Sequence, residues 1–161
     1  MKIEDGRGTR ITNQALSFKS GSSKADRDLE GEMAIIRSFR DLDVYALGRE
    51  QAKRIFAVSK AFPKEERFSL TDQIRRSSRA VNAMIAEAWA RRRYPAAFIN
   101  KIDEALGEAM ETQAWLDHAL DCGYLDRNQY RTLDDSLQKV GAMLNRMIQR
   151  ADDFCRSASQ Q

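Results

Sequence analysis

The sequence has few of the residues on which enzymes and metal sites most often depend. Its only histidine is His118, and its two cysteines, Cys122 and Cys155, lie far apart and belong to no CxxC motif or Cys/His cluster. General acid and base chemistry near neutral pH usually calls on histidine, and no Ser or Cys nucleophile is placed with His118. We therefore expect a protein that is not an enzyme and that holds no metal or other cofactor.

Long hydrophobic runs are also missing. No apolar stretch approaches the roughly 20 residues that are needed to cross a bilayer. The first ten residues, MKIEDGRGTR, have no apolar core of the kind that a secretory signal needs. Two separate cysteines suit a reducing compartment, so we expect a cytoplasmic protein that does not contact a membrane.

What the sequence does contain is helical periodicity in four stretches. Apolar residues recur there at alternating steps of three and four, which favours an all-α fold, an antiparallel four-helix bundle. The third stretch has the most regular spacing, and a helix of 3.6 residues per turn gathers its members on one stripe. These members are Phe98, Ile102, Ala105, Ala109, Thr112, Leu116 and Ala119.

The other three stripes are less regular. The inward positions that we expect are Val44, Leu47, Ile55, Val58 and Phe62 in the first helix, Leu70, Ile74, Ser77, Val81, Met84 and Ala88 in the second, and Tyr130, Leu133, Leu137, Val140, Leu144, Met147 and Ala151 in the fourth. Small residues such as Ser77 and Ser78 would let a partner helix approach closely.

Start and stop signals divide the stretches. The first helix should cover 43–61, because Pro63 cannot continue the hydrogen-bond ladder, and the Ser69 hydroxyl should cap the second. Pro95 suits the first turn of the third helix, and Gly123 suits the left-handed residue after it. Asp126 with Gln129 predicts a capping box for the fourth. The short connections predict up-down-up-down order.

Residues 1–38 are rich in Gly, Ser, Lys and Asp, which indicates a mobile N-terminal tail before a bundle at 39–156 and a disordered C-terminus at 157–161. An alternative is a short docking segment around Ile35, Ile36 and Phe39 that packs on the bundle or on a neighbouring subunit.

Charge is unevenly distributed, although the net charge is only +3. Residues 67–101 carry eight basic and two acidic side chains, whereas residues 102–135 carry nine acidic and two basic ones. At roughly 100° per residue, Arg75, Arg79 and Arg93 fall on one outward side of the second helix. The candidate contact residues are Arg75, Arg76, Arg79, Arg91, Arg92 and Arg93.

Three interpretations of these arginines stay open. They can form a solvated face that pairs with acidic residues of an adjacent helix. They can meet the acidic helices of a second subunit and so steer assembly of a ring. They can also bind phosphate, because the planar guanidinium matches phosphate geometry and a cluster attracts RNA or DNA.

Other candidate sites are weaker. Glu104, Glu108 and Glu111 lie one turn apart, but a di-iron bundle needs Glu-x-x-His on two helices, which is missing here. Trp89 and Trp115 could stack on bases, although large aromatics at helix boundaries more often fill a core or a subunit interface.

Residues 39–45, FRDLDVY, and the segment 62–125 resemble the bundle proteins encoded in intervening sequences of bacterial 23S ribosomal RNA genes, often called S23 ribosomal proteins. The match extends to Met147 and includes QIRR at 73–76 and IAE at 85–87. The resemblance implies a non-enzymatic bundle that assembles as a homopentameric barrel. A related protein, the accessory variability determinant of diversity-generating retroelements, shares that architecture and engages nucleic acid and a reverse transcriptase.

Together these observations predict an oligomeric scaffold that binds RNA or DNA through its basic face, with a reverse transcriptase as an optional further partner within the family. The alternative is a structural assembly protein that binds only protein, with its arginines used in salt bridges between subunits.

Overall fold

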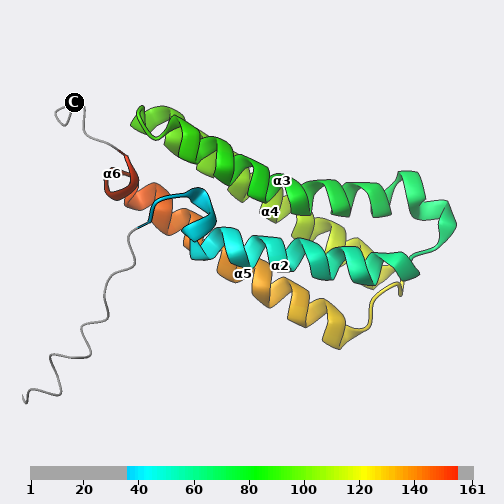
Figure 1. Cartoon of the computed structure of the whole chain (residues 1–161). Coiled ribbons are helices and arrows are strands. Elements are labelled where there is room, and N and C mark those ends of the chain that lie inside the picture. Colours follow the sequence, from blue (N-terminus) through cyan, green and yellow to red (C-terminus); the bar gives the residue numbers. More distant parts are fainter. Residues whose placement is uncertain (1–35, 156–161) are drawn as a thin grey trace, which may run out of the picture. The chain divides into compact units, whose positions relative to one another are not determined.

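The computed structural model describes residues 36–155, which contain five α-helices and three 3-10 helices and no strand (Figure 1). The long helices are α2 (Asp43–Val58), α3 (Leu70–Arg91), α4 (Pro95–Asp121) and α5 (Arg127–Gln149). The short elements are η1 (Phe39–Asp41), η2 (Ser59–Ala61), η3 (Lys64–Phe68) and α6 (Ala151–Phe154). The prediction of an all-α fold is confirmed for these residues. No helix between residues 36 and 155 is long and apolar enough to span a membrane.

The stripe expected in the third helix is the buried side of α4. All seven predicted residues, from Phe98 to Ala119, are buried, and they are the buried residues of that helix. Its boundaries also follow the sequence signals, since Pro95 is its first residue and Gly123 adopts a φ of +72° just beyond its end. Only glycine takes that backbone conformation without steric cost. Asp126 and Gln129 form the predicted capping box at the start of α5.

Two of the predicted helix boundaries are wrong in detail. The α-helix at 43–58 changes to the 3-10 helix η2 before Phe62, so the predicted α-helix to residue 61 is three residues too long. The Ser69 hydroxyl does not cap α3, because it donates a hydrogen bond to the Glu66 carboxylate. That carboxylate also accepts hydrogen bonds from the Leu70 amide, at 3.3 Å, and from the Tyr124 hydroxyl, at 3.2 Å. Glu66 therefore takes the capping role that we assigned to Ser69.

Four of the expected inward residues, Leu47, Val58, Met84 and Tyr130, are only partly buried, although all four pack against the core. In α3 it is Ile85, next to Met84, that is fully buried, because the buried face turns by one residue over this long helix. Tyr130 is partly buried at the first turn of α5. Helix α5 ends at Gln149, so buried Ala151 lies on the separate helix α6.

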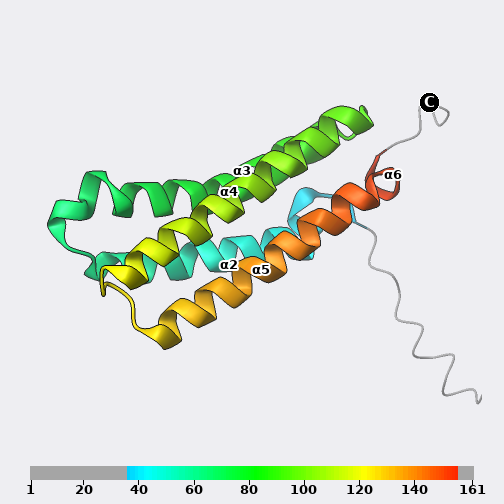
Figure 2. The same ribbon diagram turned by 180° about the vertical axis from the view of Figure 1, so that it is seen from behind.

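The core consists of two groups of buried side chains. The Phe98 cluster contains Leu42, Val44, Val81, Ile85, Ala88, Phe98, Ile102, Ala105, Ala109, Val140, Leu144, Met147 and Ala151. The Leu116 cluster contains Ile55, Phe62, Leu70, Ile74, Leu116, Ala119, Leu125, Leu133 and Leu137. Both clusters draw on all four long helices, and α3 packs along α2 and α4 while α5 packs along α4 and α2 (Figures 1 and 2).

In each of α2, α3 and α4, buried polar residues stand in the sequence between the residues of the Phe98 cluster and those of the Leu116 cluster. The Gln51 amide in α2 donates a hydrogen bond of 2.8 Å to the Leu133 carbonyl in α5. The hydroxyls of Thr112 in α4 and Ser77 in α3 lie 2.9 Å apart. Ser77 and Ser78 are both buried, in keeping with the close helix approach expected there.

The first described residues, from Ile36 to Phe39, belong to the segment that is the alternative to a mobile tail, a segment that docks on the bundle or on a neighbouring subunit. Phe39 packs against the Phe98 cluster and its ring lies 4.9 Å from that of Tyr45, whereas the Ile36 side chain is 45% exposed. Phe39 therefore docks on its own bundle. Residues 1–35 of the predicted tail, with Ile35, and residues 157–161 lie outside the described residues.

Candidate nucleic-acid interface

The six candidate arginines do not form one row. Arg75 and Arg79 lie beside α2, Arg76 contacts α4, and the other three follow one another where α3 passes into α4. The expected alignment of Arg93 with Arg75 is wrong, because α3 ends at Arg91 and its helical periodicity does not continue to Arg93. Arg75 is only partly exposed, because its side chain lies against Phe56 and Ser59.

Arg75 and Arg79 share a ring on the neighbouring helix with a third cation. Their guanidinium carbons lie 4.9 and 5.5 Å from the centre of the Phe56 ring, and the Lys60 ammonium lies 4.9 Å from it. Arg75 is fixed further, because its Nε donates a hydrogen bond of 2.7 Å to Ser59 Oγ. We call these residues, Phe56, Ser59, Lys60, Arg75 and Arg79, the Phe56 cluster.

The positive charge of the Phe56 cluster is not neutralised locally. Lys60, Arg75 and Arg79 take part in no salt bridge within residues 36–155. The Phe56 ring itself is 38% exposed, so the cations stand at the surface between α2 and α3. Three uncompensated cations held by a ring and a hydroxyl are suited to bind an anion, and guanidinium groups match phosphate in particular.

Arg76 has a different environment on the α4 side of α3. One of its terminal nitrogens lies 3.0 Å from Glu111 Oε1 and 2.9 Å from Gln73 Oε1. This pair agrees with the interpretation in which arginines bind acidic residues of an adjacent helix. An exposed pair of this kind contributes little stability and can open at small cost.

The remaining arginines lie at the end of α3. Arg91 pairs loosely with Glu87 at 3.8 Å, and Arg93 is exposed. The Arg92 guanidinium carbon lies 4.3 Å from the centre of the Trp89 ring, and the side chain donates a hydrogen bond of 2.7 Å to the Trp89 carbonyl. These contacts order Arg92 along the tip of the helix pair.

The weaker candidates have ordinary structural roles. Trp89 packs against the Phe98 cluster, and Trp115 packs against the Leu116 cluster while its Nε1 donates to Glu111. His118 is exposed beside the Trp115 ring. Glu104 pairs with Lys101, and no group of three or more potential metal ligands occurs between residues 36 and 155.

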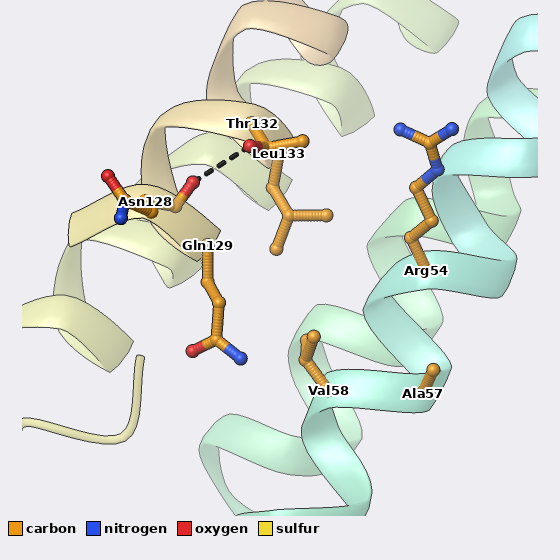
Figure 3. A pocket seen from close by; sticks show the side chains of 7 residues that line it. All are labelled: Arg54, Ala57, Val58, Asn128, Gln129, Thr132 and Leu133. Carbon is orange, nitrogen blue, oxygen red and sulfur yellow. Dashed lines mark hydrogen bonds between the residues drawn. The ribbon is translucent and has the colours of Figure 1, made fainter. Parts of the chain in front are cut away.

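A hollow of about 390 Å³ lies between the end of α2 and the first turns of α5 (Figure 3). Its lining residues are Arg54, Ala57, Val58, Asn128, Gln129, Thr132 and Leu133. The Thr132 hydroxyl donates to the Asn128 carbonyl, and Arg54 pairs with Glu50, so these two polar side chains already have partners. The lining contains no nucleophile paired with a base, and the hollow has no features of an active site.

Sequence reasoning did not identify Phe56, Ser59 and Lys60 as part of a site. Phe56 and Lys60 are four residues apart, so their contact along α2 and η2 could have been predicted. Their contact with Arg75 and Arg79 depends on how α2 and α3 are rotated against each other, and no local pattern specifies that rotation.

Comparison with known proteins identifies relatives. The family model for 23S rRNA-intervening sequence proteins matches residues 40–146. Among solved structures, the chain is similar to a protein of unknown function from the S23 ribosomal protein family of Bacteroides thetaiotaomicron, with 33% identity and a TM-score of 0.60. This similarity covers 66% of the present chain and 95% of that chain. No curated protein matches significantly.

Proposed function

The chain belongs to the family of 23S rRNA-intervening sequence proteins, and from that premise we propose that it is a non-enzymatic, cytoplasmic scaffold that binds RNA or DNA through its basic face. The observation that supports this proposal is the Phe56 cluster, in which three cations have no acidic partner within residues 36–155. Phosphate contacts of this kind hold a nucleic acid without reading its sequence.

The proposal includes an antiparallel up-down-up-down bundle. The order of the two core clusters along the chain supports it. Along α2 and α4 the residues of the Phe98 cluster come first and those of the Leu116 cluster second, whereas the order is reversed along α3 and α5. Alternate helices that run in opposite directions produce this alternation.

We further propose that the bundle assembles as a homopentameric barrel, as the family resemblance implies. Light scattering of the purified protein should give about five times the 18.4 kDa of one chain. A mass near that of one chain would contradict assembly of any kind. A gene for a reverse transcriptase beside this one would support the further partnership suggested by the accessory variability determinant.

The test of nucleic-acid binding is a double charge reversal, Arg75→Glu with Arg79→Glu. Affinity for a structured RNA, followed by fluorescence anisotropy at several salt concentrations, should fall below detection, because phosphates would then face carboxylates. Arg127→Glu with Arg131→Glu is the matched control, since it reverses two exposed arginines on α5 and should retain the salt slope of the wild type. Circular dichroism should report equal helicity for both variants.

The competing function is assembly through protein contacts alone. The pairing of Arg76 with Glu111 and of Lys101 with Glu87 favours it, because basic groups of this chain do meet acidic ones across helices. If the Arg75/Arg79 variant lost its oligomeric mass together with RNA binding, these arginines would be assembly residues. If it bound RNA with the original salt slope, the contact surface would lie elsewhere.

A further inference from the structure

The connection between α3 and α4 carries an exposed aromatic ring at its end. Tyr94 is 64% exposed, and its hydroxyl has no hydrogen-bond partner within residues 36–155. Its backbone is held from both sides, because its amide donates to the Arg91 carbonyl at 2.9 Å and its carbonyl accepts from the Phe98 amide at 3.0 Å. The ring is therefore presented to solvent from a fixed backbone.

Arginines dominate the sequence next to this ring. Arg91, Arg92 and Arg93 precede it directly, and Arg91 makes a loose contact of 3.8 Å with Glu87. Phe68 is even more exposed, at 85%, but follows the sequence KEER, in which two glutamates balance two cations. Exposure is common to the two rings, whereas an excess of arginine is found only beside Tyr94.

The other large aromatic residues near the basic segment are already in contact with protein groups. Trp89 packs against the Phe98 cluster with Arg92 over its ring, and the Phe56 ring is approached by three cations. Tyr94 is thus the ring next to arginines whose face is available to a ligand.

We propose that this tip, Arg91, Arg93 and Tyr94, is a second nucleic-acid contact, in which the Tyr94 ring stacks on an unpaired base while the two arginines bind the adjacent phosphates. Stacking on an aromatic side chain requires a base that is free of its partner strand, because bases inside a duplex present only their edges. This inference rests on the proposed function and specifies its ligand: RNA or DNA with unpaired nucleotides, such as a hairpin loop.

The experiment compares two labelled RNAs with the full-length protein, a hairpin whose loop contains 2-aminopurine and a blunt duplex of equal length. The Tyr94→Ala variant should bind the hairpin about tenfold more weakly than the wild type and the duplex equally well. The 2-aminopurine quenching seen with wild type should disappear. Tyr94→Phe, which keeps the ring, should behave as wild type, and so should the matched control Phe68→Ala.

Each other outcome overturns the inference. Equal hairpin binding by wild type and Tyr94→Ala would show that no base stacks on this ring, and an equal loss for hairpin and duplex would show that Tyr94 is not selective for unpaired bases. A reduced oligomeric mass of Tyr94→Ala would make it an assembly residue. If the wild type bound neither RNA, the proposed function would fail as well, whereas loss of binding in the Arg75/Arg79 variant alone would leave that function standing.

Discussion

The guanidinium carbon of Arg75 on α3 lies 4.9 Å from the centre of the Phe56 ring on α2. This contact joins two helices at a place where neither residue is buried in the core. It holds a cation at the surface that has no acidic partner within residues 36–155. The side chain of Arg75 is ordered by the ring and by Ser59, so less conformational freedom is lost when it binds a phosphate.

Replacement of Phe56 tests whether the ring stabilises the fold through its three cations. Phe56→Leu keeps an apolar side chain but removes the aromatic face, and we expect the free energy of unfolding to fall by about 1.5–3 kcal/mol, since each of the three exposed cation–π contacts contributes about 0.5–1 kcal/mol. Urea denaturation measures the change. Phe68→Leu, which has the single cation Arg67 near its ring, should lose less. Equal stability of Phe56→Leu and wild type would contradict a stabilising role for these contacts.

Two glycines in long helices should respond in opposite ways to alanine. A Cβ on Gly48 would lie 2.5 Å from Asn82 Oδ1, and moving Asn82 would break its hydrogen bond of 2.8 Å to the Tyr45 carbonyl. Gly48→Ala should therefore destabilise the protein by about 1–3 kcal/mol. A Cβ on Gly107 meets nothing within 4 Å, so Gly107→Ala should stabilise by about 0.5–1 kcal/mol. Thermal denaturation monitored by circular dichroism distinguishes the two, and a stabilised Gly48→Ala variant would argue against this helix crossing.

The buried hydroxyl pair of Ser77 and Thr112 should show strong coupling. Thr112→Val leaves the Ser77 hydroxyl buried with only a long contact of 3.5 Å to the Ile74 carbonyl, and we expect a loss of about 1–3 kcal/mol. The double variant Ser77→Ala/Thr112→Val removes both polar groups and should be more stable than the sum of the single changes predicts. Additive losses in a double-mutant cycle would mean that the two hydroxyls do not interact.

Stability should depend on the protonation of Glu108. Partial burial raises the pKa of this carboxyl, with a further contribution from nearby Glu111, and its buried Oε2 has no hydrogen-bond partner within residues 36–155. The folded state then binds the proton more tightly than the unfolded state, so stability rises as the pH falls through the raised pKa toward the ordinary glutamate value. At neutral pH the ionised group is a cost.

Glu108→Gln should accordingly raise the melting temperature at pH 7, and this advantage should shrink as the pH falls and the wild-type carboxyl becomes protonated. Glu104→Gln is the control, because it removes one of the two acidic partners of Lys101 and should bring no gain. A melting temperature of Glu108→Gln that is below that of wild type at pH 7 would contradict the burial argument.

Local sequence determined the elements of this protein and their inward faces. The regular stripe of α4, the proline at its start, the glycine beyond its end and the capping box of Asp126 with Gln129 all act within one or two helical turns, so a reader of the sequence can find them. The cap of α3 does not follow from the Ser69 signal, because the Ser69 hydroxyl donates to the Glu66 carboxylate and that carboxylate accepts from the Leu70 amide.

The tertiary structure decided what each arginine contacts. Arg75 and Arg76 are neighbours in sequence, yet a helix turns about 100° per residue. Arg75 therefore contacts Phe56 on α2, while Arg76 pairs with Glu111 on α4. Which of the two keeps an uncompensated charge depends on the rotation of three packed helices, and that rotation is set by the burial of side chains distant in sequence.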